Sequence, residues 1–130
     1  MTRRGPSAPP QQGEDVSPGT FLAAVRADSP EKQELDPRLV ASAKLVADIR
    51  AQCAEMGELH HALARRLMGV ENVHAELGEI VAGKKPGRET DSEIIVFDST
   101  GTALQDVAAA ALVYEKAVAA GTGLRVELGS

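Results

Sequence analysis

The order of apolar and turn-forming segments in the first third of the chain is the feature that most restricts its fold. A nearly continuous apolar run, Thr20–Val25, predicts a strand buried on both faces, although a buried helical turn would read similarly at this length. Asp36 is a good N-cap before Pro37, so a helix is expected over about Pro37–Ala43. A second strand candidate, Lys44–Asp48, follows directly. This βαβ rhythm predicts an α/β fold with a parallel sheet.

The middle of the chain supplies further elements. Apolar residues at helical spacing between residues 59 and 68 predict a helix that stops at Gly69. A short helix is expected over Ala75–Ala82, closed by Gly83. Glu93–Phe97 gives the strongest strand signal, because three aliphatic residues and a phenylalanine are grouped there.

The last thirty residues predict one long helix and one strand. The helix runs from about Thr102 to Ala120, and Gly121 is a suitable stop. Strict alternation in Leu124–Leu128 predicts a half-exposed edge strand. A sheet assembled from these parts has few strands and open edges, so we expect something outside the chain to cover them.

Composition narrows the class of protein. The chain has 130 residues, 43% of them hydrophobic, and a formal net charge of −5, which predicts at most one mildly acidic soluble domain. Aromatic residues are so few that the core must be built from Ala, Val, Leu and Ile. The acidic balance argues against a nucleic-acid surface, and no apolar run is long enough to cross a bilayer. Arg3 and Arg4 precede no apolar leader segment, so we expect a cytoplasmic location.

Several polar residues invite a functional interpretation. The charged segment Asp28–Leu35 follows the carboxyl end of the first strand, where open α/β sheets bind ligands, but a solvated loop has the same composition. The single cysteine, Cys53, is interpreted as a small packing residue. His60, His61 and His74, with Glu58, could suggest a metal site, but adjacent histidines point to different sides of a helix and no ligand set is completed, so no metal site is predicted.

Several segments of the chain contain sequence motifs that resemble those of a known family. Ala27-Asp28-x-Pro30-x-Lys32-x-Glu34-Leu35 resembles the A-D-x-P-G-K-x-E-L loop of the ornithine cyclodeaminase/mu-crystallin family. Further segments look like successive signatures of that family, in its order and spacing from about Ser17 to Tyr114: Arg50–Cys53 with Gly57–Leu59, Glu76–Ile80 with Gly83, Gly87 and Arg88, and Phe97–Gly101 with Gln105 and Asp106. The collinear set is strong evidence of descent.

The resemblance implies an NAD-binding, Rossmann-like domain, a doubly wound parallel sheet, joined to a second domain for substrate and dimerisation. Residues 18–100 would be part of the first domain, and residues 101–130 the helix and strand that return to the second, after a Pro/Gly-rich disordered tail over 1–17. No G-x-G-x-x-G turn occurs in the chain, which therefore resembles a truncated, C-terminal portion of the family's protein.

The family's functional residues carry over to four positions. Asp28 matches the general acid/base, and Lys32 a lysine that contacts the cofactor. Ser99 matches a residue at the nicotinamide side, and Thr100 its neighbour that approaches the substrate. The resemblance also implies NAD as cofactor, a small amino acid as substrate and a homodimer, with neither nucleic acid nor membrane as partner.

The implied chemistry is hydride transfer from an amino-acid α-carbon to NAD, which gives an imine. In the cyclodeaminase, ammonia then leaves and the ring closes to proline; other relatives are amino-acid dehydrogenases or ketimine reductases. A non-catalytic binding or dimerising remnant of the mu-crystallin type is the competing hypothesis, and a truncated or mis-started gene product is a third. The chain alone is expected to be inactive.

Overall fold

The structure, a computed structural model, describes residues 16–25 and 30–126. Most of the predicted N-terminal tail, and Asp28, therefore lie outside the described residues. The strands are β1 (Phe21–Val25), β2 (Lys44–Ala47), β3 (Ala75–Glu76) and β4 (Ile95–Ser99). The helices are α1 (Pro37–Ser42), α2 (Arg50–Met56), α3 (Glu58–Ala64), α4 (Leu77–Val81) and α5 (Ala103–Ala120), and Val70–Asn72 forms a 3-10 turn.

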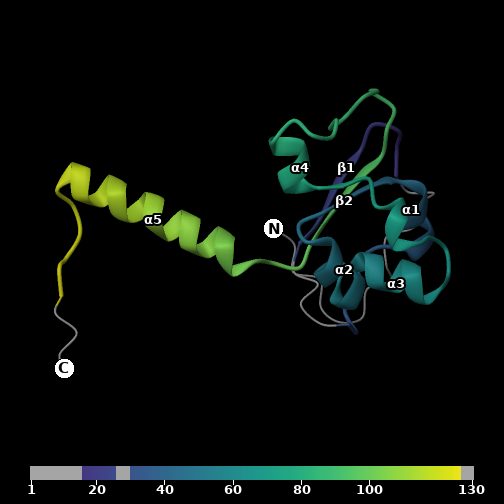
Figure 1. Ribbon diagram of the computed structural model, residues 1–130, viewed down its shortest axis with the longest axis horizontal. Coiled ribbons are helices and arrows are strands. Elements are labelled where there is room, and N and C mark those ends of the chain that lie inside the picture. Colours follow the sequence, from purple (N-terminus) through teal and green to yellow (C-terminus); the bar gives the residue numbers. More distant parts are fainter. Residues whose placement is uncertain (1–15, 26–29, 127–130) are drawn as a thin grey trace.

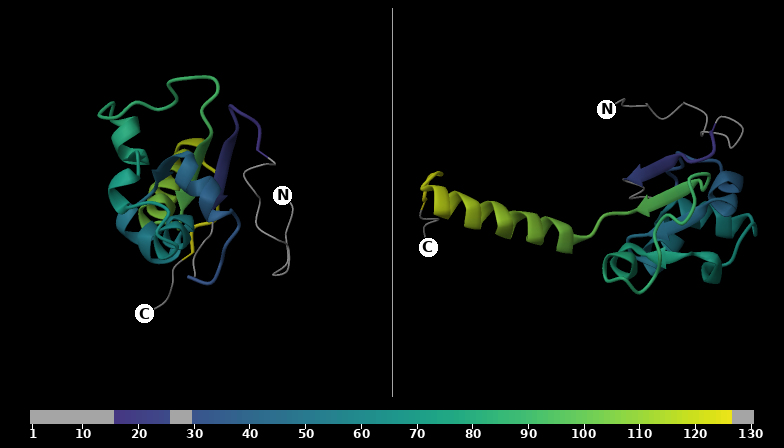
Figure 2. Two further views of the ribbon diagram at one scale, coloured as in Figure 1. Left: turned by 90° about the vertical axis from the view of Figure 1, so that its right-hand side faces the viewer. Right: turned by 90° about the horizontal axis from the view of Figure 1, so that it is seen from above.

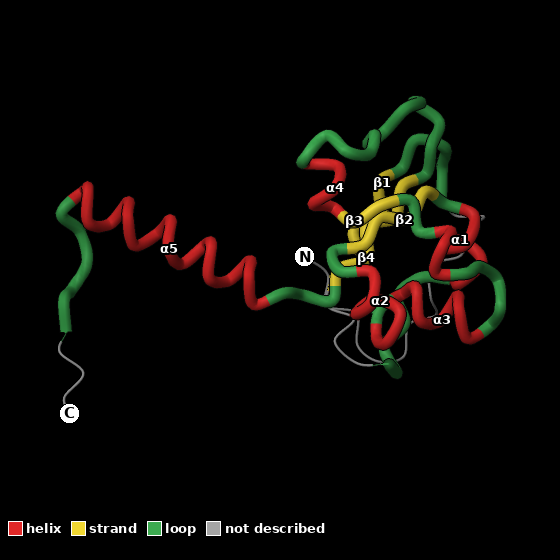
Figure 3. Tube along the Cα trace, in the orientation of Figure 1, coloured by secondary structure: helices red, strands yellow, loops and turns green. Residues whose placement is uncertain are grey.

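The four strands form one parallel sheet in the order β1-β4-β2-β3 (Figure 3). The predicted α/β fold with a parallel sheet is confirmed. The two strands of the first βαβ unit, β1 and β2, are not neighbours, because β4 lies between them. In register, Val25 lies beside Ser99, and Ala47 lies beside Asp98. Because all the strands run the same way, their carboxyl ends share one edge of the sheet.

The prediction that the first strand is buried on both faces is wrong. β1 is an edge strand, and Phe21 and Val25 are 57% and 48% exposed whereas Ala24 is 3% exposed. Since alternate residues of a strand point to opposite faces, only the face that carries Ala24 packs against the core. The helices α1–α3 gather on that side of the sheet (Figure 2).

The core is aliphatic, as the composition predicts. None of its buried residues is aromatic, and they come from the sheet, from α1–α3 and from the segments between them: Val16, Ala24, Leu35, Leu39, Val40, Leu45, Ala47, Cys53, Leu59, Ala62, Val73 and Val96. Asp36 caps α1 as predicted, because its Oδ1 accepts a hydrogen bond from the N–H of Arg38 at 2.7 Å.

Two helix boundaries differ from the predictions. α3 ends at Ala64, because Arg66 takes a left-handed conformation with φ of 56°, so Gly69 is not its stop. Ala75 and Glu76 pair with β2 as the short edge strand β3, so the helix expected from Ala75 begins only at Leu77. Sheet pairing thus overrides the local helical pattern there. α2 has no counterpart among the predicted elements.

The long helix α5 is confirmed and projects away from the sheet (Figure 1). It ends where Gly121 adopts a φ of 64°, the left-handed conformation that favours glycine. None of its residues, all in the described part of the chain, is buried. Residues 124–126 are not paired as a strand, so the predicted edge strand is wrong over that stretch, and its last residues lie outside the described range. No described helix is long and apolar enough to cross a membrane.

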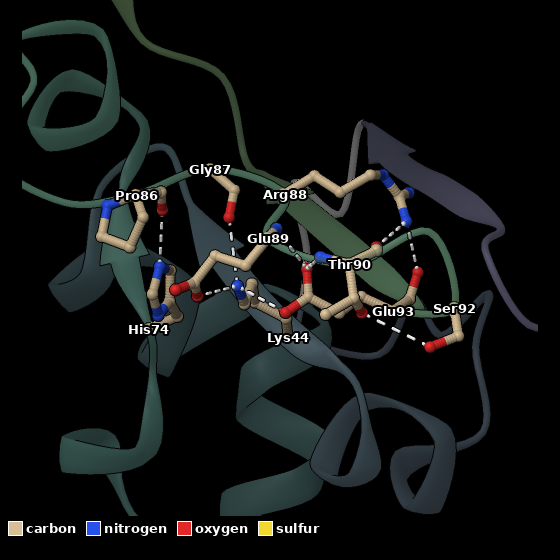
Figure 4. A network of polar contacts seen from close by, with 9 residues as sticks. All are labelled: Lys44, His74, Pro86, Gly87, Arg88, Glu89, Thr90, Ser92 and Glu93. Atoms are coloured by element: carbon tan, nitrogen blue, oxygen red, sulfur yellow. Dashed lines mark hydrogen bonds and ion pairs between the residues drawn. The ribbon is translucent and has the colours of Figure 1, made fainter.

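A polar network fixes the amino end of the sheet (Figure 4). Lys44 Nζ lies 2.6 Å from Glu89 Oε2 and 2.8 Å from Glu93 Oε1, and it donates to the carbonyl of Gly87 at 3.0 Å. The ammonium of Lys44, with the N–H of Glu89, holds the pKa of Glu93 down to about 2. Arg88 donates to the carbonyl of Glu93 at 2.7 Å. This network anchors the long loop before β4, on the side opposite the site described next.

Candidate functional site at the carboxyl edge of the sheet

The strand order places the end of β1, which precedes the predicted Asp28 loop, beside the end of β4. β1 and β4 are neighbours, and Val25 at the end of β1 lies beside Ser99 at the end of β4. Asp28 follows Val25 by three positions, outside the described residues. Lys32 lies on the described stretch after it and is exposed, with its backbone carbonyl 2.7 Å from the His61 ring. The loop that carries Asp28 and Lys32 therefore starts next to Ser99.

Ser99 and Thr100 are held by a carboxylate that the sequence interpretation missed. Asp48 Oδ2 accepts hydrogen bonds from Ser99 Oγ at 2.9 Å and from the N–H of Gly101 at 3.0 Å. Thr100 Oγ1 lies 3.5 Å from Asp48 Oδ1. Ser99 and Thr100 are only 4% and 8% exposed. The one signal for Asp48 in the sequence is its position, as the first polar residue after the apolar run of β2.

The Asp48 carboxylate is the centre of a larger set of donors. The N–H of Ile49 donates to Oδ1 at 2.6 Å, and the Cys53 thiol lies 3.2 Å from the same oxygen. Burial alone would raise the pKa of Asp48, but the hydrogen bonds from Ile49, Cys53, Ser99 and Gly101 outweigh it and lower that pKa below its usual value. Asp48 is therefore ionised at neutral pH and fixes the turn between β4 and α5.

Cys53 has the packing role that the sequence predicts. It is fully buried, and burial together with the nearby charge of Asp98 raises the pKa of its thiol. A protonated, inaccessible thiol is a poor nucleophile, so Cys53 is a structural residue.

Replacing Asp48 by asparagine is expected to destabilise the chain by about 1–2 kcal/mol, a range kept low because Asp48 is only half-buried. Asparagine keeps one acceptor but turns an NH₂ group toward the donors of Ser99 and Gly101. Urea unfolding measures the loss. Because the folded pKa of Asp48 is lowered, its contribution is present at neutral pH and is lost as the pH falls through that folded value. The two proteins should converge in stability in acid; an equal gap at every pH would contradict the charge-based account.

A second carboxylate, Asp98 of β4, is fully buried and orients α3. Its Oδ2 accepts the N–H of Leu59, at the start of α3, at 2.9 Å. Burial raises the pKa of Asp98, and hydrogen bonds from the N–H groups of Leu59 and Glu58 oppose the shift. A Cβ on Gly57 would lie 2.5 Å from Asp98 Oδ2, so the residue before α3 has to be glycine for Asp98 to reach the helix. β4 thus fixes the position of α3.

The substitution Gly57→Ala is therefore expected to cost about 1–3 kcal/mol, the usual cost of inserting a methyl group into a packed site. Gly78→Ala is the matched control, because nothing lies within 4 Å of a Cβ at Gly78 in helix α4. The control is expected to be neutral or to stabilise by up to about 1 kcal/mol. Chemical unfolding compares the two variants, and equal stabilities would show that Asp98 does not occupy the space next to Gly57.

The histidines contact backbone carbonyls. The His60 ring lies 3.2 Å from the carbonyl of Ala54, and the His74 ring lies 2.8 Å from that of Pro86. Within residues 16–25 and 30–126, no three His, Cys, Asp or Glu side chains are grouped as metal ligands would be.

The predicted cofactor residues, Lys32 and Ser99, offer groups that suit part of a dinucleotide. Lys32 provides a cation on an exposed stretch, which suits phosphate or ribose oxygens. The Ser99 hydroxyl donates its proton to Asp48, so toward a ligand it can only accept. The sequence has no glycine-rich turn to cradle a pyrophosphate. The residues present therefore fit part of a dinucleotide site, without the backbone cradle that binds the pyrophosphate.

Comparison with known proteins agrees with this partial site. The chain is 46% identical, over 119 residues, to the alanine dehydrogenase of Archaeoglobus fulgidus, covering 92% of this chain and 37% of that protein. It is 44% identical to the iminosuccinate reductase of Paracoccus denitrificans, covering 93% of this chain and 37% of that protein. The chain thus spans little more than a third of the length of these relatives.

Solved structures show the same fold. An archaeal alanine dehydrogenase dimer with bound NAD superposes with a TM-score of 0.80 at 46% identity, over 91% of this chain and 37% of that one. The Thermococcus litoralis Δ1-pyrroline-2-carboxylate reductase, in complex with NADH and L-proline, gives 0.82 at 35% identity, over 89% of this chain and 36% of that one. A model of the ornithine cyclodeaminase/mu-crystallin family matches residues 1–121. The chain belongs to the ornithine cyclodeaminase/mu-crystallin family.

Proposed function

We propose that this chain supplies the nicotinamide side of an NAD-dependent enzyme that moves a hydride between the cofactor and the α-carbon of a small amino acid or its imine. One observation carries the proposal: the chain is 46% and 44% identical to an alanine dehydrogenase and an iminosuccinate reductase, whose names denote redox enzymes of an amino acid and of an imine. The pairing of β1 with β4 supports it, because Val25, the last described residue before the predicted catalytic loop, lies beside Ser99.

Each site residue has a proposed task. Bound NAD would accept or return the hydride at the substrate α-carbon. Asp28 would take a proton from the substrate nitrogen and give it back, as its match to the family's acid/base implies. Lys32 would neutralise phosphate or ribose oxygens, and Ser99 would accept a hydrogen bond from the nicotinamide carboxamide. Thr100 would border the substrate. Asp48 would act by fixing Ser99 and Thr100.

The test is a fused enzyme, in which the upstream portion of the Archaeoglobus fulgidus alanine dehydrogenase is joined to this chain where their similarity begins. NADH consumption would be measured with pyruvate plus ammonia, iminosuccinate and Δ1-pyrroline-2-carboxylate. The cyclodeaminase reaction returns its hydride and consumes no NADH, so it would be tested with ornithine and NAD by the release of ammonia. Turnover of at least one of these supports the proposal. A fused enzyme that binds NADH but turns over none of them would favour the non-catalytic hypothesis.

The long helix is proposed to belong to the substrate and dimerisation part of such an enzyme. Large apolar side chains along α5 are exposed, among them Leu104 at 76% and Val107 at 65%. A helix with this much uncovered apolar surface needs a partner surface, which another part of a complete enzyme or a second copy would provide. Its many alanines allow close helix packing.

The purified chain is accordingly expected to self-associate, and the double variant Leu104→Gln, Val107→Gln is expected to shift it toward the monomer. Sedimentation velocity measures the change. Val81→Gln is the control, because Val81 is 81% exposed on α4, away from this surface, and should leave association unaltered. A wild-type chain that sediments as a compact monomer would contradict the prediction.

A further inference from the structure

Helix α3 holds the loop that carries Lys32. Glu58, at the start of α3, is only 1% exposed, and its two carboxylate oxygens both bind backbone N–H groups of that loop. Oε1 accepts from Glu34 at 2.8 Å, and Oε2 accepts from Leu35 at 3.2 Å. A buried carboxylate that accepts two amides at successive positions fixes the backbone there in one conformation.

A second contact from α3 reaches Lys32 itself. His61 Nε2 lies 2.7 Å from the carbonyl oxygen of Lys32. Since a carbonyl only accepts, Nε2 carries the proton and donates it. Glu58 and His61 are three residues apart, and such residues share one face of a helix. One face of α3 therefore holds the loop at both ends of the stretch from Lys32 to Leu35.

The position of α3 is tied in turn to the residue before Ser99. Asp98 accepts the N–H of Leu59 at the start of α3, and Ser99 is the next residue along β4. Helix α3 thus fixes the position of the loop that carries Lys32 relative to Ser99. The two carboxylates in this connection, Glu58 and Asp98, are buried and have no part in the proposed chemistry.

We propose that Glu58 and His61 are positioning residues that hold the backbone of residues 32–35, so that Lys32 meets the cofactor at a fixed distance from Ser99. The proposal deepens the proposed function and rests on it for the role of Lys32. The anchoring of the loop is a property of this chain alone, and it is measured without any ligand.

The protonation state of Glu58 sets the conditions for the test. Burial raises the pKa of Glu58 to about 7, and the N–H groups of Glu34 and Leu35 oppose that shift. The carboxyl of Asp98 also faces Glu58 and adds to the rise, as does that of Glu34. Measurements are therefore made above this pKa, where Glu58 is ionised and both of its oxygens accept at full strength.

The first experiment is amide hydrogen exchange on the full chain and on Glu58→Gln. Glutamine keeps one acceptor oxygen and turns an NH₂ toward the other amide. Protection at Glu34 and Leu35 is expected to fall about tenfold to 100-fold, as for the loss of a hydrogen bond to a charged group. The exposed Glu55→Gln on α2 is the control. Unchanged protection at both amides in a folded Glu58→Gln chain would overturn the proposal.

The second experiment stands even if Glu58→Gln does not fold. Trypsin cleaves at the carbonyl of Lys32 that His61 holds, and cleavage after Lys84, on an exposed turn, serves as the internal reference. His61→Leu is expected to speed cleavage after Lys32 about twofold to tenfold relative to Lys84. His61→Gln, whose amide can donate from a similar position, should restore the wild-type ratio. Equal ratios in all three proteins would overturn the role of His61.

The third experiment asks whether the anchoring matters for the cofactor. In the fused enzyme, His61→Leu is expected to raise the KM for NADH several-fold while kcat changes little, and His61→Gln should reverse the rise. An unchanged KM, with cleavage after Lys32 accelerated, would overturn the cofactor role of the anchor. A fused wild-type enzyme without activity would instead contradict the proposed function, and the exchange and cleavage results would still decide whether α3 anchors the loop.

Discussion

Asp28→Asn in the fused enzyme is expected to lower turnover by roughly 100-fold to 10,000-fold, the usual range for loss of a general acid/base. Asparagine keeps the size of the side chain and its capacity for hydrogen bonds, but it cannot take up or release the substrate proton. The affinity for NADH is expected to change little, because the proposed contact of Asp28 is with the substrate nitrogen. Steady-state kinetics and NADH titration measure the two quantities separately.

Lys32→Ala is the matched comparison on the same loop. Removal of its ammonium is expected to weaken NADH binding more than it slows the bound complex, the converse of the Asp28 pattern. Near-normal turnover in the Asp28→Asn enzyme would mean that the loop is only a solvated connection, and that the family's acid/base role does not carry over to this sequence.

NADH is expected to bind the 130-residue chain at least about 100-fold more weakly than it binds the fused enzyme. The reason is the pyrophosphate, which in Rossmann-like domains is bound by backbone N–H groups of a glycine-rich turn and by a helix N-terminus. This chain has no such turn, so the groups that would bind the pyrophosphate most strongly are missing from its sequence. Titration calorimetry of both proteins measures the ratio.

A chain that bound NADH with a micromolar dissociation constant would contradict this expectation. It would mean that other groups, such as Lys84, Lys85 and Arg88, replace the cradle. The structure disfavours such a role for Arg88, because its guanidinium already donates to the carbonyls of Gly19 and Glu93 at the opposite end of the sheet.

Local patterns were sufficient for the elements whose signals are strong. Asp36-Pro37 marked the start of α1, the aliphatic run before Phe97 marked β4, and Gly121 marked the end of α5. These positions depend on capping, β-propensity and left-handed backbone, all of which act over a few residues. The class of fold followed from their order.

Features that depend on distant partners were not visible in the sequence. The local sequence pattern predicts that Ala75 and Glu76 are helical, yet they pair with β2 as the edge strand β3. The exposure of Phe21 followed from the place of β1 at the edge of the sheet, and strand order is not encoded locally. Tertiary pairing decided both cases.

The candidate site likewise contains residues that local motifs predict and residues that only the structure shows. The resemblance predicts Lys32, Ser99 and Thr100 as site residues by their motifs, but it does not predict the groups that hold them. Asp48 lies 51 positions from Ser99 in the chain, and Glu58 lies 24 positions from Glu34. Contacts of that separation appear only once the strands are ordered, so the supporting carboxylates had to come from the structure.

The most direct test of the proposed function is to follow the hydride from NADH to the product. NADH that carries deuterium at the transferable position of its nicotinamide ring would be mixed with the fused enzyme and the imine substrate that it consumes, and the amino-acid product would be analysed by mass spectrometry and NMR. The proposed function predicts one deuterium per product molecule, bonded to the α-carbon. Product without deuterium at that carbon, or no product from any imine of the panel although NADH is bound, would contradict it.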